Sequence, residues 1–206
     1  MPFENNIFIN CPFDKAYQPI IKAIVFGVVY LGYNPLLSET INGANARVGG
    51  IQDLINESKF SIHDLSRMES SKKGELARFN MPFELGLDMG CKRFGSPFHN
   101  EKYFLIFDKE KYRYQKSISD IAGNDICIHN NEPEKALRQI RNWIRKVNGQ
   151  HIDSANKIWR LFNEFNGDFF EIARADELNE EDIKEMPWDE HCFYIREWLN
   201  GRNNFE

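Results

Sequence analysis

Five short apolar runs, separated by stretches with helical periodicity, are the feature that most constrains how this chain can fold. The runs occupy residues 6–10, 33–37, 59–65, 102–107 and 125–129. Helical segments are expected at residues 16–31, 47–56, 80–90, 112–121 and 134–147. Parallel strands need long crossovers, which are usually helices. The alternation therefore predicts a parallel sheet with helices on both faces.

General rules of chain connection narrow the topology further. Right-handed crossovers and the common strand order 2-1-3-4-5 predict a flavodoxin-like three-layer α/β sandwich over residues 1–149. Residues 150–206 differ in character, because two amphipathic segments, 155–165 and 190–199, flank an acidic stretch at 176–185. We expect a C-terminal helical appendage that packs on the first domain or on a partner, and a homo-oligomer formed through it is one expectation.

Composition argues against several classes of function. With 26 basic and 31 acidic side chains, the formal net charge is −5, so nucleic acid is not an expected partner. The four cysteines include no C-x-x-C pair, and the histidines show no metal spacing, which predicts a reduced cytoplasmic protein without a bound metal. No apolar run approaches the roughly 18 residues that cross a bilayer, and the N-terminus does not read as a signal peptide, so no membrane contact is expected.

Residues 80–90, NMPFELGLDMG, predict the start of a short helix with Asn80 as its cap and with Pro82 and Glu84 in the first turn. A glycine inside a helix costs about 1 kcal/mol relative to alanine, which favours close packing against a neighbour as the reason for Gly86 and Gly90. Glu84 admits two interpretations. It is either a structural acid favoured by the helix dipole and the cap, or a catalytic carboxylate.

Polar residues from separate segments are expected to meet at one edge of the sheet. In doubly wound folds, ligands bind outside the carboxyl ends of the strands, where the strand order reverses. The loop after the first strand, the ends of the second and third strands, and the start of the helix at 80–90 all reach this edge. The candidate residues there are Asn10, Pro12, Phe13, Asp14, Glu39, Asp64, Ser66, Arg67, Asn80 and Glu84.

Three motifs on these segments carry a family resemblance. IFINCPFD before a long apolar helix, HDLS at a strand end, and NMPFELGLDMG together resemble the TIR-like and nucleoside 2-deoxyribosyltransferase-like superfamily over residues 6–108. The resemblance implies cleavage of an N-glycosidic bond in NAD, a nucleotide or a nucleoside, with no separate cofactor. It implies that Glu84 is the catalytic carboxylate and that Asp64 lies near the ribose. It also implies a setting in bacterial defence or signalling.

Two departures from the family pattern leave the substrate open. Asp88 stands where a small residue is usual, and a long insertion at residues 66–79 precedes the helix. The implied chemistry suits a carboxylate, because departure of a base from ribose passes through an oxocarbenium-like state that a carboxylate can stabilise or attack. A position at a helix N-terminus is expected to keep that carboxylate ionised.

Other residues near this edge have both a functional and a structural interpretation. Arg47, Arg67 and Arg78 could hold phosphates, and Phe13 could stack on a base. Cys11 is either a nucleophile or a small buried thiol, with the buried thiol favoured. His63 and Asp64 are neighbours on a strand and point to opposite faces, so a core or strand-end histidine is favoured over a dyad.

Two further segments stay open. The polar and aromatic run at 112–116 either lines the crevice or forms a solvated helix face. The arginine stripe on the helix at 134–147 favours an exposed helix face over a nucleic-acid site. Two other functions also remain: a non-catalytic TIR-like module for nucleotide sensing or protein interaction, and a hydrolase that cleaves phosphate bonds.

Overall fold

The computed structural model describes residues 2–38, 47–69, 79–121 and 126–203. Within these residues, five parallel strands form one sheet in the order β2-β1-β3-β4-β5, which confirms the predicted flavodoxin-like α/β topology. The strands are β1 (Asn6–Asn10), β2 (Asn34–Leu37), β3 (Phe60–Asp64), β4 (Tyr103–Asp108) and β5 (Ile126–Ile128). The helices are α1 (Gln18–Tyr30), α2 (Arg47–Asn56), α3 (Asn80–Phe94), α4 (Pro133–Asn148), α5 (Ala155–Ala175), α6 (Glu180–Glu185) and α7 (Trp188–Asn203).

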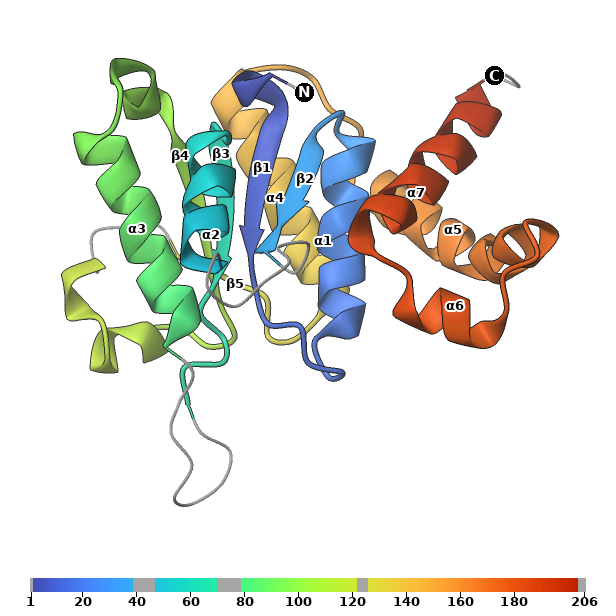
Figure 1. Cartoon of the computed structure of the whole chain (residues 1–206), viewed down its shortest axis with the longest axis horizontal. Coiled ribbons are helices and arrows are strands. Elements are labelled where there is room, and N and C mark those ends of the chain that lie inside the picture. Colours follow the sequence, from blue (N-terminus) through green and yellow to red (C-terminus); the bar gives the residue numbers. More distant parts are fainter. Residues whose placement is uncertain (1, 39–46, 70–78, 122–125, 204–206) are drawn as a thin grey trace.

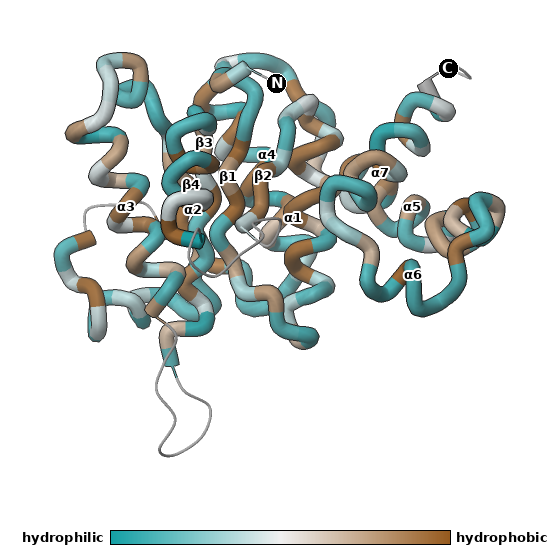
Figure 2. The backbone as a smooth tube through the Cα atoms, viewed as in Figure 1, coloured by the Kyte–Doolittle hydropathy of each residue, from teal (hydrophilic) through white to brown (hydrophobic). Residues whose placement is uncertain are grey.

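Helices cover both faces of the sheet, with α1 and α4 on one side and α2 and α3 on the other (Figure 1). The alternation of side chains along β1 sets these two layers. Ile7 and Ile9 belong to the core formed with α1 and α4, whereas Phe8 packs with Ile51 and Ile55 of α2. Every residue of β1 and β3 is buried, and the apolar residues of these strands lie between the two helical layers (Figure 2). Both strands also bury polar residues at their carboxyl ends.

The C-terminal helices pack on the sandwich through aromatic rings. The ring centroid of Phe26 on α1 lies 5.5 Å from that of Phe162 and 5.7 Å from that of Phe165, both on α5. Trp198 on α7 closes the cluster at 6.4 Å from Phe26. Residues of α5 and α7 therefore share one hydrophobic core with α1 and α4.

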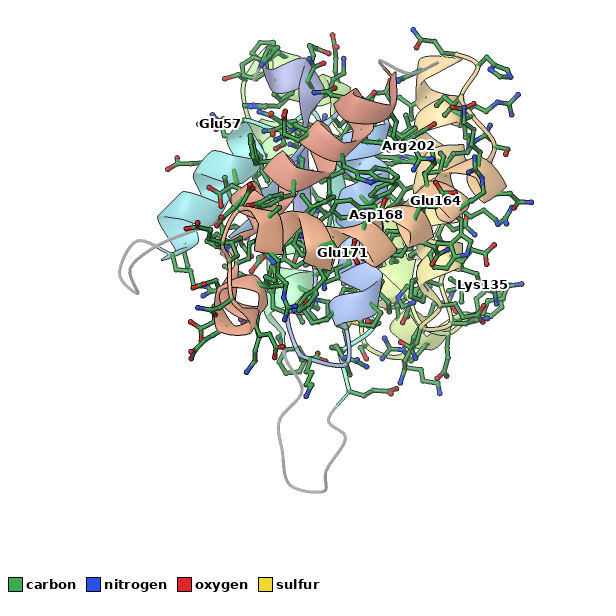
Figure 3. All side chains as sticks on the ribbon, turned by 90° about the vertical axis from the view of Figure 1, so that its right-hand side faces the viewer. Glu57, Lys135, Glu164, Asp168, Glu171 and Arg202 are labelled. Carbon is green, nitrogen blue, oxygen red and sulfur yellow. The ribbon has the colours of Figure 1, made fainter. Side chains whose placement is uncertain are left out.

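Polar contacts join α5 to α7 at the surface (Figure 3). Arg202 of α7 pairs with Glu164 of α5 at 2.8 Å, and the Trp198 indole donates to Asp168 at 2.9 Å. The acidic stretch predicted between two helices contains the short helix α6, which begins with a capping box formed by Asn179 and Asp182. No helix in the described part of the chain is long and apolar enough to cross a membrane.

The predicted helix at 112–121 is wrong. The structure has two short 3-10 turns there, Arg113–Lys116 and Ser119–Ile121. Tyr112 adopts φ 62°, in the left-handed region, so the chain cannot enter an α-helix at this residue.

Several expectations for α3 are also wrong. Phe79 is the N-cap and Asn80 is already the first helical residue, so Asn80 does not cap the helix. Glu84 is consequently the fifth helical residue and lies in the second turn. Close packing does not explain the glycines either, because a Cβ atom added to Gly86 or Gly90 would meet nothing within 4 Å.

Candidate functional site

Asn10 fixes the start of α3 against the ends of two strands. Its side-chain amide is buried and donates to the carbonyl oxygen of Met81 at 2.9 Å. The same nitrogen lies 3.0 Å from Nδ1 of His63, at the end of β3. Because an amide nitrogen only donates, Nδ1 accepts this bond and the other ring nitrogen of His63 carries the proton. One asparagine therefore joins β1, β3 and α3 at the carboxyl edge of the sheet.

A buried chain of charged groups continues from His63 along the inner side of α3. Its Nε2 lies 3.0 Å from Asp88, and the other oxygen of Asp88 lies 3.1 Å from Nζ of Lys102. Asp88 and Lys102 are fully buried. Burial raises the pKa of Asp88, but the hydrogen bond from His63 and the charge of Lys102 outweigh it and hold the pKa below its usual value.

Lys102 owes its position to backbone acceptors as well as to Asp88. Its ammonium donates to the carbonyl oxygen of Ile55 at 2.7 Å and to that of Ser58. The sequence interpretation treated Lys102 as the polar start of a strand and missed this role. A lysine beside an apolar run carries no sequence signal for burial, because long charged side chains usually reach solvent.

Asp64 lies in a second buried cluster, on the opposite face from His63, as the strand alternation predicted. Its carboxylate accepts hydrogen bonds from the Tyr17 hydroxyl and, at 2.7 Å, from the backbone N–H of Ser66. Nε2 of His129, which follows β5, lies 3.0 Å away. Burial raises the pKa of Asp64, but His129, Ser66 and Tyr17 outweigh it and hold the pKa below its usual value. The carboxylate is fully buried, which leaves neither oxygen exposed to meet a ribose.

Glu84 differs from both of these acids because little compensates for its burial. It lies on the inner face of α3, between Met81 and Asp88, and only 5% of its surface is exposed. Its Oε2 is buried and has no hydrogen-bond partner in the described part of the chain. Burial raises the pKa of Glu84 to about 7, and the positive charge of Arg47 at the start of α2 opposes this only in part.

The expectation that the helix terminus keeps Glu84 ionised is therefore wrong. The helix dipole acts over the first turn, and Glu84 lies one turn deeper, where desolvation dominates. At neutral pH the side chain is near the midpoint of its titration. A carboxyl group in this state can act as a proton donor or acceptor with little change in its surroundings.

The loop residues form the outer part of this edge. Asp14 pairs with Arg67 at 3.2 Å, and both are partly exposed. Asp14 also accepts from the N–H of Ala16, so it closes the turn before α1 and does not cap that helix, whose N-cap is Tyr17. Phe13 is half-buried against the main core.

The other candidate residues lie in different surroundings. Pro12, Ser66 and Cys11 are buried, and Asn80 and Arg47 are exposed. The burial of Cys11 agrees with the structural interpretation of that thiol. Glu39, Arg78 and most of the insertion at 66–79 lie outside the described residues, so the structure does not bear on them.

The polar and aromatic run after β4 has a structural role. Arg113 is buried, and its Nε donates to Asp108 at 2.9 Å. Nη2 of the same guanidinium donates to the carbonyl oxygen of Leu65 at 2.6 Å, so this residue joins the ends of β3 and β4. Tyr112 is exposed and Tyr114 is buried. The run is therefore neither a solvated helix face throughout nor, as a whole, a lining of the crevice.

These features define a doubly wound α/β protein with four buried acids among its described residues, Asp64, Glu84, Asp88 and Asp108, of which Glu84 has the least compensation. Among the described residues, no group of three or more histidine, cysteine, aspartate or glutamate side chains could hold a metal ion. Comparison with protein-family models and with curated proteins found no match to the chain.

Proposed function

We propose that the protein cleaves an N-glycosidic bond in NAD or in a related nucleotide or nucleoside, with Glu84 as the catalytic carboxylate. The observation that carries the proposal is the burial of this acid without a partner for Oε2, in the turn of α3 that follows the Asn10 anchor. An uncompensated buried acid lowers the stability of a fold. Such groups therefore occur preferentially where chemistry requires them.

The raised pKa of Glu84 fits a substrate that brings a positive charge. A cationic nicotinamide ring, or the oxocarbenium-like ribose formed as the base departs, lowers the pKa of a nearby carboxyl group. Glu84 would thus ionise when the cationic substrate binds, and its carboxylate would then stabilise or attack the anomeric carbon. Water completes the hydrolysis, and the base leaves as neutral nicotinamide.

The buried network acts in this proposal as a set of positioning residues. Asn10 ties the first turn of α3 to β1, and Asp88 ties the third turn to β3 and β4 through His63 and Lys102. Glu84 lies between these two anchors on the same helix face. Because Asp64 is fully buried, it makes no direct contact with the ribose in this proposal and instead stabilises the end of β3.

The test is to incubate the protein with NAD and with deoxynucleosides and to follow release of nicotinamide or free base. Glu84→Gln keeps the size of the side chain and removes its charge, so we expect release to be abolished in a protein that still folds. Glu171→Gln is the matched control and should retain full activity, because Glu171 is exposed on α5 (Figure 3) and α5 lies on the opposite side of the molecule from α3 (Figure 1). Full activity in Glu84→Gln would exclude the assignment.

The enclosure of Asp64 favours one alternative function. If neither oxygen of Asp64 is available to a ligand, the fold can serve as a non-catalytic module for nucleotide sensing or protein interaction. This alternative predicts nucleotide binding without release of base. Release of phosphate without free base would instead indicate cleavage of a phosphate bond. A cytoplasmic setting is proposed on the ground that the four cysteines are widely spaced in the sequence and include no C-x-x-C pair.

A further inference from the structure

The outward face of α3 carries an unusual line of residues, which we call the outer stripe: Phe79, Phe83, Gly86, Gly90 and Phe94. Their spacing of three or four residues places them on one side of the helix. The exposed fractions of the three phenylalanines are 63%, 55% and 86% in chain order. The glycines between them leave the middle of the stripe without side chains.

The polarity of α3 departs from that of an ordinary surface helix. Its inner face holds the acids Glu84 and Asp88 beside two apolar residues, and its exposed face holds the three phenylalanines beside Arg93. A surface helix normally directs its charged residues to solvent. Solvation of α3 therefore does not explain the outer stripe, whereas burial of the three rings against a protein partner would explain it.

The exposed area agrees with an interface. At roughly 200 Å² for one phenylalanine, the three rings leave on the order of 400 Å² exposed. That is comparable to the largest apolar patch of a typical monomer, roughly 300–600 Å², and is about half of the roughly 800 Å² that each partner buries in a standard complex. The neighbouring surface of α2 and α3 can supply the remainder.

The order of residues in the stripe makes it complementary to itself. When two copies of α3 run antiparallel about a two-fold axis, each residue of one copy faces one residue of the other. The two residue numbers of every such pair add up to the same value. In one register Phe79 faces Phe94 of the other copy and Phe83 faces Gly90. The axis then passes between Gly86 and Leu87, which face each other. Each large side chain then meets a ring or a bare stretch of backbone, as an isologous interface requires.

A hollow beside Gly90 offers room for the ring that this register brings there. Its volume is about 450 Å³, and it lies between α2 and the second half of α3, with Leu87, Gly90 and Phe94 in its lining. An aromatic side chain seated in such a hollow is the usual anchor of a protein interface.

We propose that the outer stripe of α3 binds a second copy of this chain, antiparallel about a two-fold axis, with Phe83 of each copy seated beside Gly90 of the other. The interface lies on the opposite side of the sandwich from the C-terminal helices (Figure 1), through which the sequence interpretation placed self-association. The inference does not depend on the proposed function.

The oligomeric state of the full chain tests the proposal. Light scattering or sedimentation across a concentration series should give twice the chain mass of 24.2 kDa. Phe83→Asp and Gly90→Leu should each weaken association about thirtyfold or more, as expected for loss of a central anchor. Neither should unfold the protein, because Phe83 is exposed and a Cβ atom at Gly90 meets nothing within 4 Å. Circular dichroism and the melting temperature check this.

Matched controls come from the C-terminal helices. Gly167→Leu changes another helical glycine with open space for a Cβ atom, and Phe193→Asp removes another exposed phenylalanine; both should leave the dimer intact. A monomeric wild-type protein throughout the series would overturn the proposal. A dimer that resists both α3 substitutions, or that Phe193→Asp dissociates, would overturn it equally.

Cross-linking tests the register itself. In a Cys91→Ser background, a mixture of the Phe83→Cys and Gly90→Cys proteins should form a disulfide-linked dimer under mild oxidation. Each variant alone should not, because identical positions lie about seven residues, or about 10 Å, apart along the antiparallel helices, beyond disulfide reach. Cross-linking of either variant alone at the efficiency of the mixture would refute the antiparallel register.

Discussion

Glu84→Gln should stabilise the folded protein at alkaline pH. Wild-type Glu84 has a pKa of about 7 in the folded protein, against an ordinary value of 4.5. When the folded pKa of an acid is raised, the unfolded chain gives up its proton first, so the fold loses stability as pH rises from the lower value to the higher one. Below the lower value, both states hold the proton and there is no penalty.

The size of the effect follows from the two pKa values. A rise from 4.5 to about 7, at about 1.4 kcal/mol per pKa unit, corresponds to at most about 3.5 kcal/mol above neutral pH. Relaxation of solvent and of the Arg47 charge around the new carboxylate reduces this, so we expect a gain of between about 1 and 3 kcal/mol for the neutral glutamine. The gain should nearly vanish at about pH 4, where Glu84 is protonated in both states.

Urea unfolding of the wild-type and Glu84→Gln proteins at about pH 8 and about pH 4 provides the measurement. Glu171→Gln, exposed on α5, should match the wild-type protein at both pH values. The comparison isolates Glu84, because every other titrating group is common to both proteins. Equal stability at about pH 8, or a less stable glutamine variant, would mean that an undetected partner compensates the carboxylate, and the argument for a functional acid would lose its basis.

Two further perturbations test the buried charges. Lys102→Met leaves Asp88 and two backbone carbonyls without their cation. We therefore expect the free energy of unfolding to fall by about 3–5 kcal/mol and the melting temperature to fall by about 10 °C. Lys135→Met, at a surface ion pair, is the control and should change the free energy of unfolding by about 0.5 kcal/mol or less. Burial among aromatic rings lowers the pKa of His191 to about 4, so the fold should lose stability as pH falls from about 6.5 toward 4. His191→Phe should remove that part of the acid sensitivity in urea titrations, and an unchanged pH profile would contradict the assignment.

The sheet was predictable from sequence because its signals are local. Each strand is a short apolar run, and each crossover has helical spacing or turn residues of its own. Handedness and strand order then leave few topologies open. The wrong prediction of a helix at residues 112–121 has a specific cause. A glycine would have indicated a backbone with positive φ, but Tyr112 adopts that conformation without any such sign in the sequence.

The site was predictable in part. The segments that converge at Asn10 follow from the topology, and the opposite orientations of His63 and Asp64 follow from strand alternation. The partners of these residues do not follow from the sequence, because His129 comes just after β5 and Lys102 just before β4. Only the folded chain brings them next to Asp64 and Asp88. The state of Glu84 was misjudged because a shift of one residue at the N-cap moved it from the first turn of α3 to the second.

The two proposals meet in the construction of α3, and one physical argument connects them. A helix that turns two acids toward the sheet and three phenylalanines toward solvent gains less from folding than the reverse arrangement would provide. Pairing of the inner acid Asp88 with His63 and Lys102 recovers part of the deficit. Burial of the outer rings against a second copy would recover another part, because the ring surface that the monomer exposes would leave water. Glu84 would then be the one element of the helix that neither the core nor a dimer compensates, as expected if its partner is a bound substrate.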